Sequence, residues 1–341
     1  MDQRSEREVA SMTDSVFVTR LIPDEGLDII KRNFRTSVWS ADMPPSSEEM
    51  VARAKRCSAL VSLLSDKIDE SVIGSLPKLR VIAQYAVGFD NIDVTTATKR
   101  GVIVTNTPGV LTETTADLAW ALIMAASRRI AEADRYVRAG LWHVAWGPML
   151  MLGIDIYSAT LGIVGMGRIG AAVAQRAKGF GMRILYSDTQ ENDFTRSVEK
   201  ETGAARTDFA SLLRESDIIT VHVPLTNETK NMIGAEEFAS MKKGAVFVNT
   251  SRGAVVDENA LVSALSSGRL HAAGLDVFAT EPLPSTSPLL RLPNVVLVPH
   301  IGSASFATRS KMAVMCAENL VLALRGNRPP NIVNPEVLIH R

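Results

Sequence analysis

The chain is poor in the residues that mark secreted, membrane-spanning or nucleic-acid-binding proteins. It has two cysteines in 341 residues and no CxxC pair, which excludes a disulfide framework or a zinc knuckle. No apolar run reaches the roughly 18 residues that a membrane span needs. Lysine plus arginine and aspartate plus glutamate both number 37, so no overall basic charge would bind nucleic acid. We therefore expect neither a membrane nor a nucleic acid as partner.

The N-terminus shows no targeting signal. Its first fourteen residues mix Arg, Glu and Asp without a hydrophobic segment, and we interpret them as a solvated tail. Cys57 and Cys316 each lie within an apolar helical pattern, so we expect both to be small buried hydrophobic residues. Unpaired cysteines and the lack of an export signal favour a cytoplasmic location.

The first part of the chain is predicted to form an α/β unit. A length of 341 residues favours two domains. From Ser15 onward, short apolar runs alternate with helical patterns, which is typical of βαβ units and a parallel sheet. We expect strands at residues 16–19, 58–64, 79–85 and 101–105, and helices at 24–34, 46–56, 69–76 and 92–100.

A second α/β unit follows. Thr114-Thr115-Ala116-Asp117 resembles a capping box that would open a long helix to Ser127. A helix at about 130–139 and an irregular aromatic stretch at 141–157 come next. We expect further strands at 161–164, 183–186, 218–223, 245–249, 272–276 and 295–298, and a last helix at about 306–325.

The strongest local motif is a glycine loop between an apolar strand and an alanine-rich helix at 171–179. In this setting the first glycine makes a tight turn, the second lets a pyrophosphate approach the backbone, and the third lets helix and strand pack closely. The helix N-terminus favours the negative charge. The sequence therefore predicts dinucleotide contacts at Gly165, Gly167, Arg168, Ile169 and Gly170.

Asp188 predicts which dinucleotide is used. It follows the next expected strand, eighteen residues after Gly170, where dinucleotide-binding folds carry a ribose-binding acid. A carboxylate there accepts bonds from two ribose hydroxyls and repels a 2′-phosphate. Residues 189–193 bring no Arg or Lys that could bind such a phosphate. The sequence thus favours NAD(H) over NADP(H).

Three polar residues follow three strands of this second unit, at the sheet edge where doubly wound folds bind ligands. They are Arg252, Glu281 and His300. Arginine can hold a carboxylate with two parallel donors and polarise a neighbouring carbonyl. Histidine can protonate a developing alkoxide, and a carboxylate on its other ring nitrogen would orient the ring. We therefore predict that these three residues are catalytic in the reduction of a 2-oxo acid, and we predict no metal site.

The other four histidines are weaker candidates for the proton donor. His143 lies in the aromatic stretch, His271 begins a strand and His340 is in the C-terminal tail, so structural or solvated roles are expected. His222 ends a strand and could touch the cofactor, but its segment offers no carboxylate partner.

Together these motifs resemble the D-isomer-specific 2-hydroxyacid dehydrogenase family. The resemblance extends from about Ser15 to Pro335 and is carried by the glycine loop and by residues 249–253 (NTSRG), 274–282 (GLDVFATEP) and 299–303 (PHIGS). Within the family, the glyoxylate/hydroxypyruvate reductase branch is most similar, on residues 85–93 (YAVGFDNID), 106–112 (NTPGVLT) and 300–305 (HIGSAS).

The resemblance implies roles for individual residues. Arg252 would bind substrate, Glu281 and His300 would form the acid/base pair, and the backbone N–H groups of Val87 and Gly88 would bind the substrate carboxylate, near Leu63. The implied cofactor contacts are Thr115, Pro224, Thr229, Thr250, Arg252, Asp276, His300 and Gly302. A homodimer is also implied, in which Trp146 either reaches the partner subunit's substrate site or packs in the dimer core.

The resemblance also implies an architecture of two doubly wound parallel-sheet domains. A flavodoxin-like substrate-binding (catalytic) domain would comprise residues 15–111 and 303–335, and an NAD-binding Rossmann domain would comprise residues 112–302. The implied function is NAD(H)-dependent reduction of a small 2-oxo acid, of the glyoxylate/hydroxypyruvate type, to the D-2-hydroxy acid.

The sequence shows one departure from this branch and leaves two alternative functions open. Several reductases of this branch carry an arginine just past the second Rossmann strand and use NADP, whereas this chain has Thr189 there. A 2-ketogluconate-type or other D-2-hydroxyacid dehydrogenase is an alternative, because the sequence does not give the size of the substrate pocket. An NAD-sensing corepressor-like binding protein is a second alternative, although the chain lacks the long tails of such proteins.

Overall fold

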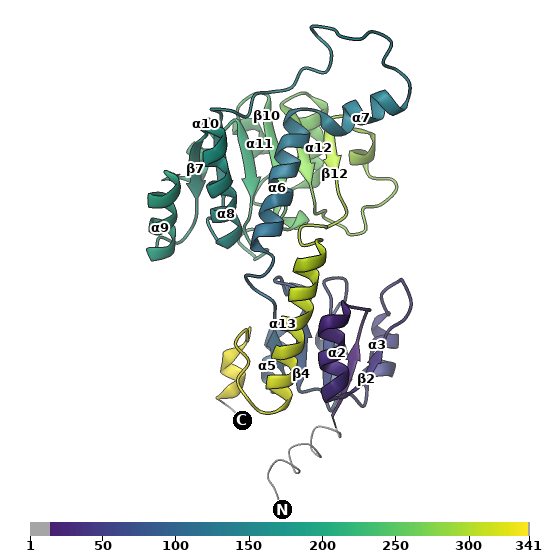
Figure 1. The fold of residues 1–341 in the computed structure, drawn as a ribbon. Coiled ribbons are helices and arrows are strands. Elements are labelled where there is room, and N and C mark those ends of the chain that lie inside the picture. The colour runs from purple at the N-terminus through teal and green to yellow at the C-terminus, as the bar shows by residue number, and fades with distance from the viewer. Residues whose placement is uncertain (1–13, 340–341) are drawn as a thin grey trace, which may run out of the picture. The chain divides into compact units, whose positions relative to one another are not determined.

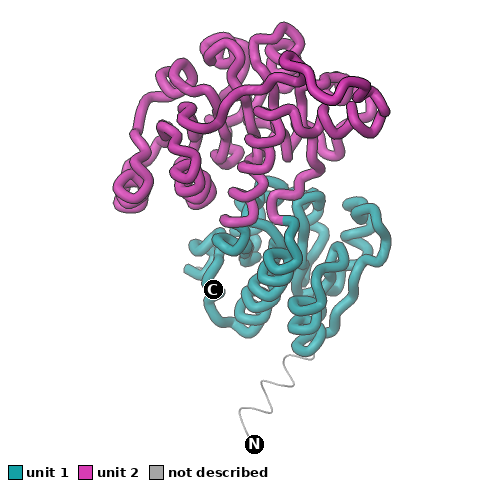
Figure 2. Tube along the Cα trace, turned by 45° about the horizontal axis from the view of Figure 1, so that its top comes forward, with its two compact units in different colours: residues 1–111, 304–341 teal, residues 112–303 magenta. Residues whose placement is uncertain are grey.

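The computed structural model describes residues 14–339. Figure 2 shows two compact units, which we call unit 1 and unit 2. Unit 1 combines the chain up to Leu111 with the chain from Ala304 onward, and unit 2 is Thr112–Ser303. Our interpretation of His340, and nearly all of that of the N-terminal tail, concerns residues outside the described range.

Unit 1 is built on a five-stranded parallel sheet in the order β2-β1-β3-β4-β5. This is the flavodoxin-like strand order. Helices α2 and α13 pack side by side on one face (Figure 1), and α3, α4 and α5 cover the other. The elements are β1 (Ser15–Val18), α2 (Asp24–Asn33), β2 (Arg35–Val38), α3 (Ser47–Ala54), β3 (Ala59–Ser62), α4 (Glu70–Gly74), β4 (Val81–Gln84), α5 (Val94–Lys99), β5 (Ile103–Thr105), α13 (Phe306–Leu324) and the short 3₁₀ helix η4 (Pro335–Leu338).

Unit 2 is built on a seven-stranded parallel sheet in the order β12-β11-β10-β9-β6-β7-β8, which contains the Rossmann order. Its strands are β6 (Thr160–Val164), β7 (Arg183–Ser187), β8 (Ala205–Arg206), β9 (Ile218–Val221), β10 (Ala245–Asn249), β11 (Leu270–Leu275) and β12 (Val295–Leu297). The α/β class with two doubly wound parallel sheets is therefore confirmed.

Two apolar cores hold the sheet of unit 2 between helices. One core joins α6 and α8 to one face, and the other joins α10, α11 and α12 to the opposite face. The helices of the unit are α6 (Thr112–Ser127), α7 (Ile130–Arg138), α8 (Arg168–Ala177), η1 (Lys178–Phe180), α9 (Asp193–Thr202), α10 (Phe209–Glu215), α11 (Ala235–Ser240), η2 (Gly253–Val255), α12 (Glu258–Ser266) and η3 (Pro288–Arg291). The burial of both faces explains why β10 is apolar up to its last residue, Asn249.

Some expectations of local structure are wrong. The capping box at Thr114 is not one, because α6 begins at Thr112 and Thr114 lies inside the helix. Cys57 follows the end of α3 and precedes β3, so it is not helical, although both cysteines are buried and free. Strands β2 and β8 were not expected, because they lie at sheet edges where side chains need not be apolar.

The helices of residues 14–339 include none that is long and apolar enough to cross a membrane.

Candidate active site

A histidine–carboxylate pair lies beyond the carboxyl ends of β11 and β12. The Nδ1 atom of His300 is 2.7 Å from Oε2 of Glu281, and Oε1 of Glu281 accepts a hydrogen bond of 3.0 Å from the Phe278 N–H. Burial raises the pKa of the Glu281 carboxyl, but the hydrogen bond and charge of His300, the Phe278 N–H and the Arg252 charge outweigh it, so the pKa lies below its usual value. Because Nδ1 is bound to Glu281, Nε2 is the ring nitrogen available to a substrate.

Asp276 fixes the backbone around His300. His300 has a φ of 53°, a left-handed conformation that is uncommon outside glycine. The buried Asp276 carboxylate accepts hydrogen bonds from the next two N–H groups, at 2.6 Å from Ile301 and 2.9 Å from Gly302. Burial raises the pKa of Asp276 to about 6, although these N–H groups and the His300 charge act in the opposite direction. Asp276 therefore holds the turn that presents the histidine.

Arg252 lies in the loop after β10, close to the loop after β11 that carries Phe278 and Glu281. The side chain of the buried Asn249 accepts a hydrogen bond from the Ser251 N–H and donates one to the Arg252 carbonyl, at 2.9 and 3.0 Å. At Gly253 a Cβ atom would overlap the carbonyl group of Phe278, so only glycine lets the two loops come so close. This approach explains why the Arg252 charge acts on Glu281. Arg252, Glu281 and His300 are thus neighbours, as the sequence predicts.

The glycine loop joins β6 to α8 and fits a dinucleotide. A Cβ atom on Gly170 would overlap the Gly165 carbonyl oxygen, so this glycine allows helix and strand to pack closely. Gly167 has an ordinary φ of −76°, and a Cβ atom there would meet no described atom within 4 Å. Neither strain nor packing within the described chain accounts for a glycine at this position. The missing side chain leaves room for a ligand to approach the backbone. The start of α8, with Arg168 exposed and Ile169 half-buried, suits a pyrophosphate there.

Asp188 directly follows β7 and its carboxylate is anchored by the backbone. Oδ2 accepts a hydrogen bond of 2.7 Å from the Met166 N–H of the glycine loop, and Oδ1 accepts one of 2.9 Å from the Gln190 N–H. Its negative charge is therefore held beside the loop, where the sequence places the ribose-binding acid.

A cation from a strand later in the sequence also lies at the turn after β7. Residues 189–193 contain no cation, but Arg206 of β8 reaches the same turn and donates a hydrogen bond of 2.9 Å to the Asp188 carbonyl oxygen. This arginine escapes sequence reasoning because it lies eighteen residues after Asp188 and comes close only through the pairing of β8 with β7.

Several other predicted cofactor contacts gather in unit 2. Thr115, in the first turn of α6, is buried and lies against Gly302, which is bonded to Asp276. Thr229 donates a hydrogen bond of 2.6 Å to the Pro224 carbonyl and so shapes the loop after β9. The structure brings these residues to the carboxyl edge of the sheet, and their cofactor contacts remain predictions.

His222 lies close to the predicted cofactor contact Thr250, whose hydroxyl is 3.4 Å from His222 Nδ1. The Thr220 hydroxyl lies 2.9 Å from its other ring nitrogen. Burial lowers the pKa of His222 to about 3, so this histidine is neutral and unsuited to donating a proton at neutral pH.

The predicted substrate-binding residues Leu63, Val87 and Gly88 lie on loops after strands β3 and β4 of unit 1. Side-chain amides bind the carbonyl oxygens of these three residues: Asn91 donates to Leu63 at 3.0 Å, Asn106 to Val87 at 2.8 Å and Gln84 to Gly88 at 3.2 Å.

On the loop after β3 the Leu63 N–H donates a hydrogen bond of 2.7 Å to the Asp66 carboxylate, whereas the loop after β4 offers N–H groups that bond to no described residue. Among the described residues, no hydrogen-bond acceptor is recorded for the Val87 or Gly88 N–H. These two N–H groups could therefore bind an anion, and their contact with the substrate carboxylate remains a prediction. The roles of the three amides were missed in the sequence, because Gln84 ends β4 and the two asparagines lie in loops, where single polar residues give no periodic signal.

Trp146 lies in the irregular stretch after α7 and is 76% exposed. Other large apolar side chains of this stretch are also exposed, namely Leu141, Trp142, Val144, Met149, Leu150 and Leu152. An apolar surface of this kind is typical of an interface with another molecule. The role of Trp146 remains a prediction.

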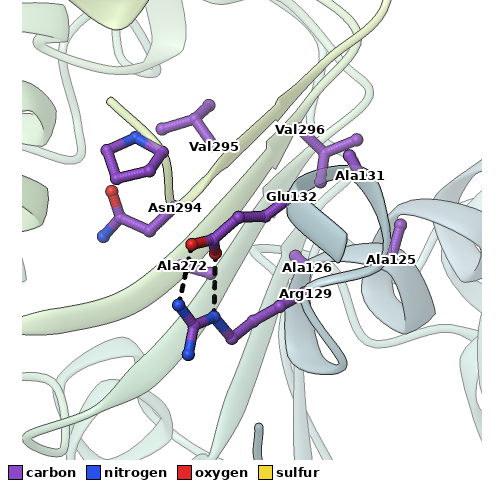
Figure 3. A pocket seen from close by; sticks show the side chains of 10 residues that line it. Ala125, Ala126, Arg129, Ala131, Glu132, Ala272, Asn294, Val295 and Val296 are labelled. Atoms are coloured by element: carbon purple, nitrogen blue, oxygen red, sulfur yellow. Dashed lines mark hydrogen bonds and ion pairs between the residues drawn. The ribbon is translucent and has the colours of Figure 1, made fainter. Parts of the chain in front are cut away.

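A shallow hollow lies at the opposite end of the strands from His300, near the amino ends of β11 and β12. Figure 3 shows Arg129 facing Glu132 there, and their two hydrogen bonds are both 2.8 Å long. Because these charges already neutralise each other, the hollow is a weaker candidate site than the His300 edge. No cluster of metal-binding side chains is found among residues 14–339.

Comparison with known proteins identifies related enzymes. Residues 120–302 match the family model described as D-isomer specific 2-hydroxyacid dehydrogenase, NAD binding domain. The chain is 60% identical over 328 residues to the glyoxylate reductase of Korarchaeum cryptofilum, which covers 96% of this chain and 98% of that protein.

Solved structures agree with this result. The chain is similar to a protein from Thermus thermophilus, with a TM-score of 0.87 and 44% identity, covering 94% of this chain and 99% of that one. It is also similar to an NADPH-dependent glyoxylate/hydroxypyruvate reductase from Sinorhizobium meliloti in complex with NADP and malonate. That match has a TM-score of 0.83 and 31% identity, covering 95% and 98% of the two chains.

Proposed function

The chain belongs to the D-isomer specific 2-hydroxyacid dehydrogenase family, within its glyoxylate reductase branch, and we propose that it reduces glyoxylate and hydroxypyruvate with NADH. It is an oxidoreductase acting on CH–OH groups. The observation that carries the proposal is the 2.7 Å pair of Glu281 and His300 beside Arg252, on the sheet edge that also presents the glycine loop.

In the proposed reaction, the carbonyl carbon of the 2-oxo acid gains a hydride and the carbonyl oxygen gains a proton. A bound nicotinamide cofactor supplies the hydride. His300 donates the proton from Nε2, while Glu281 keeps Nδ1 bonded and stabilises the positive ring before transfer. Arg252 binds the carboxylate and polarises the carbonyl, and the N–H groups of Val87 and Gly88 bind the carboxylate oxygens.

We infer a preference for NADH from Asp188. Its carboxylate is fixed beside the glycine loop, where it suits two ribose hydroxyls and opposes a 2′-phosphate. The Sinorhizobium meliloti relative is NADPH-dependent, so the preference is a property to be measured for this chain.

We also propose a homodimer. The exposed apolar side chains of the stretch after α7 would be covered by a second copy of the chain. Trp146 would then lie either in that interface or at the partner subunit's substrate site.

The experiment is NADH and NADPH consumption by the purified chain with glyoxylate, hydroxypyruvate, pyruvate, phenylpyruvate and 2-ketogluconate. We expect the highest kcat/KM with NADH and glyoxylate or hydroxypyruvate, and D-glycerate as the product from hydroxypyruvate. A clear preference for 2-ketogluconate would favour the sugar-acid alternative. Binding of NADH without turnover of any 2-oxo acid would contradict the proposal.

A further inference from the structure

Two arginines meet at the turn that follows β7. Arg206 of β8 is paired with Tyr186 of β7, and its guanidinium extends to the residues beyond that strand. It donates hydrogen bonds to the Asp188 carbonyl oxygen at 2.9 Å and to Oε2 of Glu191 at 3.0 Å. Oε1 of Glu191 lies 3.4 Å from Nη1 of Arg196. One glutamate thus binds two guanidinium groups next to the predicted ribose-binding acid.

The negative charge of Asp188 is fixed at this place. Its two oxygens accept hydrogen bonds from the N–H groups of Met166 and Gln190, so the carboxylate cannot easily turn away. Met166 belongs to the loop that would hold the pyrophosphate. A 2′-phosphate on the adjacent ribose would therefore meet a fixed like charge.

We propose that Arg206 is a second residue that determines cofactor choice, by binding a 2′-phosphate once the Asp188 charge is removed. NADH is then preferred although a cation lies at this turn, because Asp188 repels the 2′-phosphate and the Arg206 guanidinium is already paired with Glu191. The proposal rests on the proposed use of a nicotinamide dinucleotide.

The chemistry of Arg206 suits this role. A guanidinium offers parallel donors that match phosphate oxygens better than an ammonium does. The Arg206 side chain is 37% exposed and Glu191 is 53% exposed, so a ligand could reach the arginine and water could solvate the released glutamate. A purely structural role, fastening β8 to the turn, would instead affect both cofactors equally.

The test is the dissociation constant of NADH and of NADPH, measured by titration calorimetry on the full chain without substrate. The variants are Asp188→Ser, Asp188→Ser with Arg206→Gln, and Asp188→Ser with Glu191→Gln. We expect Asp188→Ser to tighten NADPH binding about tenfold, and the added Arg206→Gln to weaken it again about tenfold while NADH changes less than about twofold. Adding Glu191→Gln should tighten NADPH binding by about threefold more, because Arg206 is released.

Arg183→Gln is the matched control. Arg183 begins β7 at the other edge of the sheet and pairs with Glu215 at 2.7 Å, so its loss should leave the NADH to NADPH ratio unchanged. Arg206→Lys in the Asp188→Ser background keeps the charge and should retain part of the NADPH gain, which separates the charge from a folding defect.

The outcomes distinguish this proposal from the proposed function. Equal NADPH binding by Asp188→Ser with and without Arg206→Gln would overturn the role of Arg206, and so would equal weakening of both cofactors. Failure of the unmodified chain to bind NADH would contradict the proposed function itself. Normal NADH binding with no turnover would contradict only the proposed reaction.

Discussion

The two units carry opposite chemistry at the ends of their strands, although both are parallel sheets covered by helices. In unit 2 the loops after β10, β11 and β12 present ionisable side chains, with His300 and Glu281 in direct contact. In unit 1 the loop after β4 presents the backbone N–H groups of Val87 and Gly88, and neutral amides such as Asn106 hold the neighbouring carbonyls.

The difference reflects what each set of groups is proposed to do. A group that gives up a proton must change its charge, and its neighbours must stabilise one charge state, as Glu281 does for His300. A group that only binds a carboxylate works best without titrating. We therefore expect changes at the unit 2 loops to alter kcat and its pH dependence, and changes at the unit 1 loops to alter mainly KM.

The largest effect is expected from His300→Gln. Glutamine can fill much of the space of the ring but cannot protonate the carbonyl oxygen, so kcat/KM for glyoxylate should fall about 10²- to 10⁴-fold. NADH binding should weaken by a much smaller factor, since His300 is one of many implied cofactor contacts. Steady-state kinetics and an NADH titration check this, and activity near that of the unmodified chain would remove His300 from the reaction.

A somewhat smaller effect is expected from Arg252→Lys. Lysine keeps the positive charge but loses the two parallel donors, so kcat/KM should fall roughly 10- to 100-fold. The dissociation constant of NADH should change by a much smaller factor, since the paired donors are proposed to bind the substrate and Arg252 is one of many implied cofactor contacts. If the variant turned over glyoxylate normally, Arg252 would not be the substrate's carboxylate ligand.

Asn106→Ala tests the proposed role of unit 1, where uncharged groups would bind the substrate carboxylate. The Val87 carbonyl would lose its hydrogen-bond partner, which costs about 1–3 kcal/mol, and the neighbouring N–H groups would be less well placed. We expect KM for glyoxylate to rise about 3- to 10-fold, with an unchanged pH profile.

Asn294→Ala is the control for that variant. Asn294 also donates hydrogen bonds to backbone carbonyls, those of Leu265 and His271, but lies just before β12 at the other edge of the unit 2 sheet. It should lower the melting temperature without raising KM. An equal rise of KM in both variants would show that lost stability, and not the placement of Val87, is the cause.

Much of the fold is predictable because its central strands are apolar on both faces. Strand β10 was placed at residues 245–249, as observed, since every one of its side chains is buried. Strands β2 and β8 could not be found in this way. Strand β2 alternates exposed and half-buried residues, and β8 has two residues, so neither leaves an apolar run in the sequence.

The residues of the candidate site likewise fall into those that a strand pattern predicts and those that it does not. Arg252, Glu281 and His300 could be predicted because each follows a recognisable strand, and strand ends meet at one edge of a parallel sheet. Arg206 and Asn106 could not, because their importance comes from backbone atoms far away in the sequence or on another strand. Such contacts depend on strand pairing, which the sequence pattern does not reveal.

The central claim is that Glu281 stabilises the protonated ring of His300 during reduction. The low pKa of Glu281 keeps it negatively charged at neutral pH, and Glu281→Gln removes that charge while keeping an oxygen that can face Nδ1. Since reduction needs a protonated His300, the rate should fall at high pH, and loss of the charge should make it fall at lower pH.

The most direct measurement is kcat/KM for glyoxylate reduction across pH, in the unmodified chain and in Glu281→Gln. We predict that the basic limb of the profile moves to lower pH in the variant. The same basic limb in both proteins, under conditions where chemistry limits the rate, would contradict the claim.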